Sequence, residues 1–197
     1  MGKRILIIDG HPDGRAERFI HALATAYGDA ARGAGHEVKV VRIADLEFPL
    51  LHRAEDFQSR AALPEVLRFC QEFISWADHL VIAFPLWLGT LPAALKALLE
   101  QVLRPGFAFA DATQPHELPR KLLSGKSVRI IVTMGMPALV FRWYFGGHGL
   151  KSLQRGILGF CGFKPVRSTL IGGVESIGAQ RRAAWLERIR ELGKRGL

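Results

Sequence analysis

Two kinds of apolar pattern alternate along the 197-residue chain. Nearly continuous apolar runs of about six residues are typical of parallel strands covered on both faces, whereas apolar residues spaced three or four positions apart indicate helices. The runs predict strands at residues 4–9, 38–43, 79–84, 127–133 and 166–171. The helical spacing predicts helices at residues 16–34, 63–76, 92–103, 150–160 and 179–193. Strand and helix therefore alternate five times.

This alternation predicts an α/β fold. Right-handed crossovers between parallel strands place helices on both faces of one sheet. Five strands in a chain of this length fit a three-layer sandwich with the flavodoxin-like strand order 2-1-3-4-5 better than a six-stranded dinucleotide fold. No repeat or linker divides the chain, so we expect a single domain over residues 1–197. Residues 45–61 are expected to be irregular, and residues 134–149 to form a loop with one helical turn.

Composition narrows the class of protein. Hydrophobic residues make up 49% of the chain and charged residues 23%, which suits a packed domain and argues against wholesale disorder. Cys70 and Cys161 are too few for a disulfide scaffold or a cysteine zinc cluster, so we expect reduced thiols and no metal site. The first apolar run is too short for a signal peptide, and prolines and a lysine interrupt the most apolar stretch, residues 79–99. We therefore expect a cytoplasmic protein without a membrane-inserted segment.

The formal net charge of +9 favours anionic partners. Basic residues are densest at residues 181–197, where Trp185, Leu186, Ile189 and Leu192 also share one face of the expected helix. The basic residues are then expected to form the solvated face of that helix. No recognition helix or aromatic-basic RNA motif is present, so nucleic acid is not a predicted partner.

The loops that follow strands one, three and four are the expected site, because ligands of such sheets bind outside the carboxyl ends of the strands. The first of these loops contains His11, Arg15 and Arg18 and leads into a helix N-terminus, which favours phosphate. It matches neither the G-x-G-x-x-G motif nor the P-loop. An ordinary strand-to-helix turn with an incidental histidine is the alternative interpretation.

The second loop is unusually apolar for a connection. It places Trp87 between two leucines, which indicates that a flat conjugated ligand packs on the indole ring. Backbone N–H groups of residues 86–89, Gly89 included, would then donate to the polar edge of that ligand. Alternatively, Trp87 seals the core or a subunit interface.

The third loop carries the clearest pair of proton-transfer groups. Gly135 allows close approach of the backbone, and Tyr144 and His148 flank two glycines. No nucleophile motif or metal cluster accompanies them. An anion site, an aromatic platform and a mild acid pair together favour a bound cofactor, and a flavin fits all three.

The sequence resembles the flavodoxin-like NAD(P)H:quinone oxidoreductases, the DT-diaphorase-like family, over nearly the whole chain. The motifs that carry the resemblance are GHP at residues 10–12, FPLWLGTLPA at 84–93, TMG at 133–135, Tyr144 with His148-Gly149, and GILGFCGF at 156–163. The resemblance is specific because all five motifs occur, and they occur in the family's order. It implies a tightly held flavin, a homodimer, and a pocket at the dimer interface that both substrates use in turn.

The resemblance also assigns residues to roles. It implies that His11 and Phe19 belong to the flavin phosphate loop, with Arg18 standing where the family has Ser or Thr. Tyr144 and His148 match the catalytic pair that stabilises charge on the flavin. The remaining cofactor-binding positions that it implies are Pro85, Leu86, Trp87, Leu88, Thr133, Met134, Gly135 and Arg182.

We therefore predict a flavin-dependent oxidoreductase that passes a hydride from NAD(P)H to a quinone-like acceptor in a two-electron, ping-pong cycle. FAD is the predicted flavin, with FMN as the alternative. Two other functions stay open: a redox-sensing ancillary subunit that contacts a potassium-efflux antiporter peripherally, and a one-electron carrier like flavodoxin. The carrier is disfavoured because such proteins are usually acidic.

Overall fold

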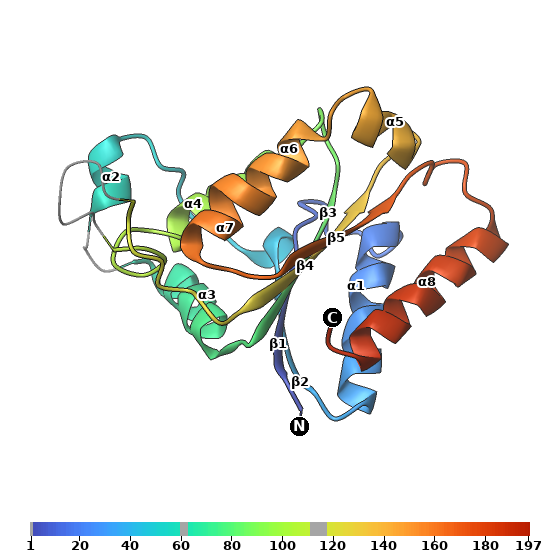
Figure 1. The fold of residues 1–197 in the computed structure, drawn as a ribbon, viewed down its shortest axis with the longest axis horizontal. Helices are drawn as coiled ribbons and strands as arrows, with labels where there is room; N and C mark the ends of the chain where they lie inside the picture. Colours follow the sequence, from blue (N-terminus) through green and yellow to red (C-terminus); the bar gives the residue numbers. More distant parts are fainter. Residues whose placement is uncertain (1, 60–62, 111–117) are drawn as a thin grey trace.

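The structure is a computed structural model that describes residues 2–59, 63–110 and 118–197. Its centre is one parallel sheet of five strands in the order β2-β1-β3-β4-β5 (Figure 1). The strands are β1 (Arg4–Asp9), β2 (Glu37–Arg42), β3 (His79–Pro85), β4 (Ser127–Thr133) and β5 (Val166–Ile171). The predicted fold class and strand order are confirmed, and each predicted strand lies within one residue of the observed one.

The helices form a layer on each face of this sheet (Figure 1). The helices α1 (Phe19–Gly33) and α8 (Ala179–Lys194) lie side by side on one face. The other face is covered by α3 (Glu65–Trp76), α4 (Ala93–Val102) and a continuous helical segment of α6 (His148–Lys151), the π-helical η2 (Ser152–Leu158) and α7 (Gly159–Cys161). The predicted three-layer sandwich is therefore present.

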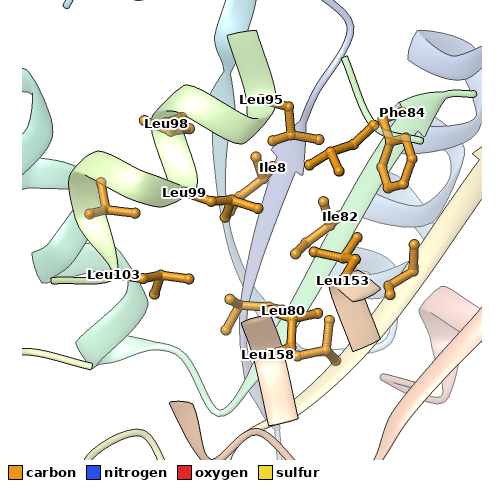
Figure 2. Close-up of a cluster of buried hydrophobic side chains, with 14 of the residues drawn as sticks. Ile8, Leu80, Ile82, Phe84, Leu95, Leu98, Leu99, Leu103, Leu153 and Leu158 are labelled. Atoms are coloured by element: carbon orange, nitrogen blue, oxygen red, sulfur yellow. The ribbon is translucent and has the colours of Figure 1, made fainter. Parts of the chain in front are cut away.

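The apolar runs form strands because the alternation of side chains gives each layer of helices its own core. Ile5 and Ile7 face α1 and α8, whereas Leu6 and Ile8 face α3 and α4. Figure 2 shows the second of these cores, where Ile8 and side chains of β3 meet leucines of α4 and η2. Burial of a leucine or isoleucine side chain contributes about 1.5–3 kcal/mol, so these contacts fix the register of the strands.

Three connections contain short helices, of which only the last matches a prediction, the helical turn expected within residues 134–149. These are the 3₁₀ turn η1 (Ile43–Asp45), the short helix α2 (Ala54–Gln58) and the helix α5 (Ala138–Trp143). The apolar residues of α5 are mostly exposed, so they give no amphipathic pattern to recognise. The first helix begins at Phe19 rather than at residue 16, because side-chain bonds hold the preceding loop in another conformation.

The predictions for residues 79–99, for the two cysteines and for the last helix agree with the described residues. Residues 79–99 form a strand, a loop and a helix, and among the described helices no apolar segment is long enough to cross a membrane. Cys70 and Cys161 are buried free thiols whose pKa values burial raises to about 11 and about 12. In α8, Ile189 is fully buried and the three other apolar residues of the predicted face pack beside it.

Candidate active site

The first predicted loop leaves β1 and crosses the end of β3. The N–H of Gly10 donates to the carbonyl of Ala83 over 2.7 Å. His11 is buried, and its Nδ1 accepts from the N–H of Asp13 at 3.0 Å, so the proton of the neutral ring sits on Nε2. Burial and the neighbouring His21 lower the pKa of His11, which keeps this ring neutral. His11 therefore presents one N–H donor at the sheet edge.

The two arginines of this loop are paired within the loop itself. Asp13 accepts from the guanidinium groups of Arg15 and Arg18, with closest distances of 2.7 and 2.6 Å. The hydrogen bonds from Arg15 and Arg18 hold the pKa of Asp13 well below its usual range. Arg18 lies at the N-cap of α1, whereas the predicted helix start at residue 16 placed it inside the helix. Its charge is directed at a carboxylate of the protein. A phosphate ligand would compete with Asp13 for these two groups.

A buried ion pair that sequence reasoning missed supports the loop from beneath. Asp9 ends β1, and its Oδ2 lies 2.5 Å from Nδ1 of His21 in α1. The other ring nitrogen, Nε2, lies 2.9 Å from the carbonyl oxygen of Asp13, which is an acceptor only, so Nε2 donates there. The Asp9–His21 contact therefore joins the end of β1 to α1 beneath the loop. The two residues stand twelve positions apart, one on a strand and one on a helix, and no local motif marks them.

The N-terminus of α1 supplies further donors. It has no side-chain cap and no acidic residue in its first turn. Among the described residues, the N–H groups of Phe19 and Ile20 have no acceptor within the chain. Free N–H groups at a helix N-terminus favour a phosphate or another anion. The ring of Phe19 is covered by the guanidinium of Arg182, whose carbon lies 5.0 Å from the ring centroid.

Arg182 thus lies beside the start of α1, next to the loop that follows β1. Its guanidinium also donates to the carbonyls of Val174 and Ile177, at 3.1 and 3.3 Å, so it joins the start of α8 to the connection after β5. Two predicted residues of distant sequence, Phe19 and Arg182, are therefore in direct contact.

The second predicted loop forms a tight hairpin. Trp87 and Thr90 exchange two backbone hydrogen bonds, at 2.9 and 3.0 Å. The two residues between them have positive φ angles, 47° for Leu88 and 79° for Gly89, which is the geometry of a type I′ turn. Leucine is unfavourable in this conformation, and the Leu88 side chain is fully exposed. A strained, solvated leucine is typical of a binding surface.

Hydrogen bonds within the hairpin occupy two of the four backbone N–H groups that were predicted to bind a ligand. The N–H of Leu86 donates to the carbonyl of Thr133 at 2.7 Å, and that of Trp87 donates to Thr90. Within the described part of the chain, the N–H groups of Leu88 and Gly89 have no acceptor. Those two groups are free to donate to a ligand. The half-buried Pro85 and Leu86 place the hairpin at the end of β3.

Two of the predicted loops meet at Trp87. Its indole ring lies 5.7 Å from the imidazole of His11, edge to face. Trp87 keeps about half of its surface exposed, so it does not seal the core. The structure therefore brings together the predicted phosphate loop and the predicted aromatic platform.

The third loop begins with three predicted residues. Thr133 is buried at the end of β4, and the Met134 side chain packs in the core, so a contact of Met134 with a ligand is limited to its main chain. The N–H of Met134 donates to Ile171, whereas that of Gly135 has no acceptor among the described residues. A Cβ at Gly135 would lie 3.0 Å from a carboxylate oxygen of the exposed Glu175 side chain, so Gly135 and Glu175 are close neighbours.

The predicted catalytic pair lies after α5. Tyr144 is 83% exposed and packs edge to face against Phe145. His148, at the start of α6, is exposed, and its ring lies over Gly146, where a Cβ would come within 2.5 Å of Nε2. Neither side chain forms a hydrogen bond within the described residues, nor do their rings touch. Both groups are therefore accessible to a ligand.

Gly149 joins the third loop to the hairpin of the second. A Cβ at this position would lie 2.2 Å from the carbonyl oxygen of Gly89 and 2.9 Å from Cα of Thr90. This close backbone approach is possible because residue 149 is a glycine. The three strand-end loops thus form one continuous surface.

Comparison with known proteins shows the family of the chain. A family model for the flavodoxin-like fold matches residues 3–193. The chain belongs to this family. An NAD(P)H oxidoreductase of Haemophilus influenzae is 28% identical over 185 residues, 92% of this chain and 90% of its own. An FMN-dependent NADH:quinone oxidoreductase of Pseudomonas aeruginosa is 31% identical over 141 residues, 70% of this chain and 61% of its own.

The solved structures agree on the fold. The NAD(P)H:quinone oxidoreductase of Methanothermobacter marburgensis superposes with a TM-score of 0.81 at 22% identity, covering 98% of this chain and 96% of its own. The predicted resemblance to flavodoxin-like NAD(P)H:quinone oxidoreductases is therefore confirmed.

Proposed function

We propose that this protein is a flavin-dependent oxidoreductase that passes a hydride from NAD(P)H to a quinone-like acceptor. The observation that carries the proposal is the meeting of three strand-end loops that present free N–H groups beside the half-exposed ring of Trp87. The names of the relatives, which include NAD(P)H, FMN and quinone, support the same chemistry. The predicted cytoplasmic location and ping-pong order belong to this proposal.

The residues fit a flavin on three counts. The uncapped N-terminus of α1 and the Nε2–H of His11 are donors suited to a phosphate. The N–H groups of Leu88, Gly89 and Gly135 are donors suited to the polar edge of a planar ring. The Trp87 ring offers an apolar face for packing. Pro85, Leu86 and Thr133 hold these donors in place.

A bound flavin supplies two-electron chemistry, taking a hydride from the nicotinamide and giving it to the quinone. Side chains of the protein position the substrates and balance the charge that develops during the reaction. We assign to the hydroxyl of Tyr144 and the imidazole of His148 the roles of proton donors and of stabilisers of negative charge. Leu88 and Trp87 exclude water from the face on which substrates stack.

We assign FAD as the flavin, with FMN as the alternative. The contact of Arg182 with Phe19 extends the cationic surface beyond the phosphate loop, which favours a ligand longer than a single phosphate. The FMN-dependent relative favours the shorter one. The mass of the cofactor released by heating decides between them.

The predicted homodimer is also part of the proposal. A patch of exposed apolar side chains surrounds the candidate site, and such patches on a protein surface mark interfaces. Its members are Trp87, Leu88, Leu139, Val140, Trp143, Tyr144 and Phe145. A second copy seated on this patch would cover the apolar surface. Light scattering should give twice the mass of the chain.

The test is NAD(P)H oxidation with a quinone acceptor, measured with added FAD or FMN. We expect activity that depends on flavin, and a slower reductive half-reaction for Tyr144→Phe combined with His148→Ala at unchanged flavin content. Trp143→Phe, next to the pair, is the control. Flavin-loaded protein without quinone reductase activity would contradict the proposal, and unchanged hydride transfer in the double variant would remove the assigned roles.

A further inference from the structure

A second groove lies beside α5, and several residues of the third predicted loop, from Ala138 to Gly147, form part of its lining. It follows the free edge of β5 between α8 and the segment from α5 to η2, and its volume is about 680 Å³. That volume is within the range of about 300–1,000 Å³ that is usual for small-molecule sites. None of the residues assigned to the flavin or to catalysis lines it.

The lining of this groove is strongly basic. It contains no aspartate or glutamate among the described residues, and its five charged members are Arg129, Arg142, Lys151, Arg155 and Arg188. None of the five forms an ion pair within the described part of the chain. Like charges gathered without counter-charges repel one another, so this arrangement costs stability unless a ligand offsets it.

Another groove of the same molecule shows the ordinary arrangement. The groove between α1 and α8 has a similar volume, about 700 Å³, and also contains four basic side chains. Each of these four is paired with a carboxylate within 4 Å: Arg32 with Asp29, Arg42 with Asp45, Arg190 with Glu187, and Lys194 with Glu191. The protein thus neutralises the cations of one groove and leaves those of the other unpaired.

Arg129 makes the contrast sharper, because it is more than nine-tenths buried. It lies on β4, beneath the groove, and its guanidinium makes one long hydrogen bond, 3.4 Å, to the hydroxyl of Thr169. Its Nε has no partner among the described residues. Burial lowers the pKa of Arg129, and the like charges of Arg167 and Arg188 lower it further. A buried, unpaired guanidinium is costly, and departures of this kind are typical of functional sites.

The groove suits phosphate groups better than other anions. Four of its five cations are arginines, whose planar fork bonds phosphate in a bidentate manner. Five cations around one small volume match a ligand with several negative charges close together. We propose that the β5-edge groove binds a small oligophosphate, with two or three linked phosphate groups, either free or attached to a nucleoside.

Calorimetric titration of the purified full-length protein tests the proposal. The probes are inorganic triphosphate, ATP, adenosine and sulfate, each at an ionic strength matched with NaCl. We expect triphosphate and ATP to bind with one site per chain and adenosine not to bind. Tighter binding of ATP than of triphosphate identifies a nucleotide, and equal binding identifies the phosphate chain alone. Failure of both to bind overturns the proposal, as does sulfate binding as tightly as triphosphate.

Variants locate the site. Arg155→Ala and Arg188→Ala should each weaken triphosphate at least about tenfold, as expected for loss of a charge-assisted hydrogen bond. Arg181→Ala removes the same charge from an exposed position on α8 outside the groove and should leave the affinity within about twofold. Equal losses in all three variants would show an effect of net charge and overturn the site.

Arg129→Met separates a built site from a cluster of surface charges, because it should change both ligand binding and the stability of the ligand-free protein. It should abolish triphosphate binding and also raise the thermal midpoint of the ligand-free protein, because it removes an unpaired buried charge at similar volume. A variant that binds triphosphate like the wild type would overturn the role of Arg129. Binding of an acidic peptide or RNA at the Arg155 and Arg188 positions, without binding of triphosphate, would overturn the ligand class. Addition of FMN should not compete with triphosphate, because the two sites share no residue.

Discussion

The contact of Gly149 with the hairpin at Gly89 and Thr90 predicts the effect of adding one methyl group. In Gly149→Ala, the new Cβ would lie 2.2 Å from a backbone carbonyl oxygen, whereas ordinary contact begins at 3.4 Å. The hairpin and α6 must therefore separate by roughly 1 Å. Overpacking of this kind costs about 1–3 kcal/mol. Alanine is favoured over glycine in a helix by up to about 1 kcal/mol. We expect a net loss of about 1–2 kcal/mol in the free energy of unfolding.

The same displacement should affect binding more than stability. The N–H groups of Leu88 and Gly89 move with the hairpin, and a shift of about 1 Å in a site can cost on the order of 100-fold in rate. The assays are urea denaturation, flavin titration and quinone reduction. Gly156→Ala is the matched control, because its Cβ would meet nothing closer than Ser152 Oγ at 3.9 Å. A Gly149→Ala protein with wild-type stability and wild-type flavin affinity would refute the assigned contact.

Three further changes test other parts of the structure. Leu88→Asn should raise the unfolding free energy by about 1 kcal/mol, because asparagine tolerates a positive φ, and should raise the KM for quinone; a thermal scan and steady-state kinetics check it. Asp13→Asn frees two guanidinium groups and should tighten flavin binding in a fluorescence titration. In the wild type, protonation of Asp13 below about pH 4 removes its ion pairs and lowers the free energy of unfolding, and this pH dependence should be absent in the variant. Burial lowers the pKa of His79 to about 3. Below about pH 6.5 the unfolded chain therefore binds a proton at His79 that the folded chain does not bind. The free energy of unfolding should fall as the pH is lowered from about 6.5 to about 3. His79→Gln should remove this component in denaturant titrations at several pH values, and an unchanged pH dependence would count against the buried neutral ring.

The fold could be predicted because the apolar runs and the helical spacing are global features of the sequence. Burial of β1 and β3 on both faces requires continuous apolar runs, and these appear directly as residues 4–9 and 79–84. The helix α5 was predicted only as one helical turn somewhere within residues 134–149, since Phe141 is its one buried member. The π-helical turn of residues 152–158 also lacks a sequence signal, because its hydrogen-bond pattern depends on packing.

The sequence predicted which loops lie together at the strand ends, and it did not predict the side-chain pairings within them. The glycines and aromatic residues of the strand-end loops are unusual for connections, so the sequence marks Trp87 and Gly135. The partner of Arg18 was not predictable, because the loop conformation decides that Asp13 takes up its charge. The pairing of Asp9 with His21 likewise arises only when α1 packs on β1. Such contacts depend on tertiary geometry, which no short motif encodes.

The most direct measurement is the stoichiometry and identity of flavin bound to the purified chain, with the cofactor released by heating and weighed by mass spectrometry. The account predicts one flavin per chain, and a large loss of it in Trp87→Ala, which removes the aromatic face that links the first two loops. A chain that carries no flavin and binds neither FAD nor FMN in titration would contradict the central claim.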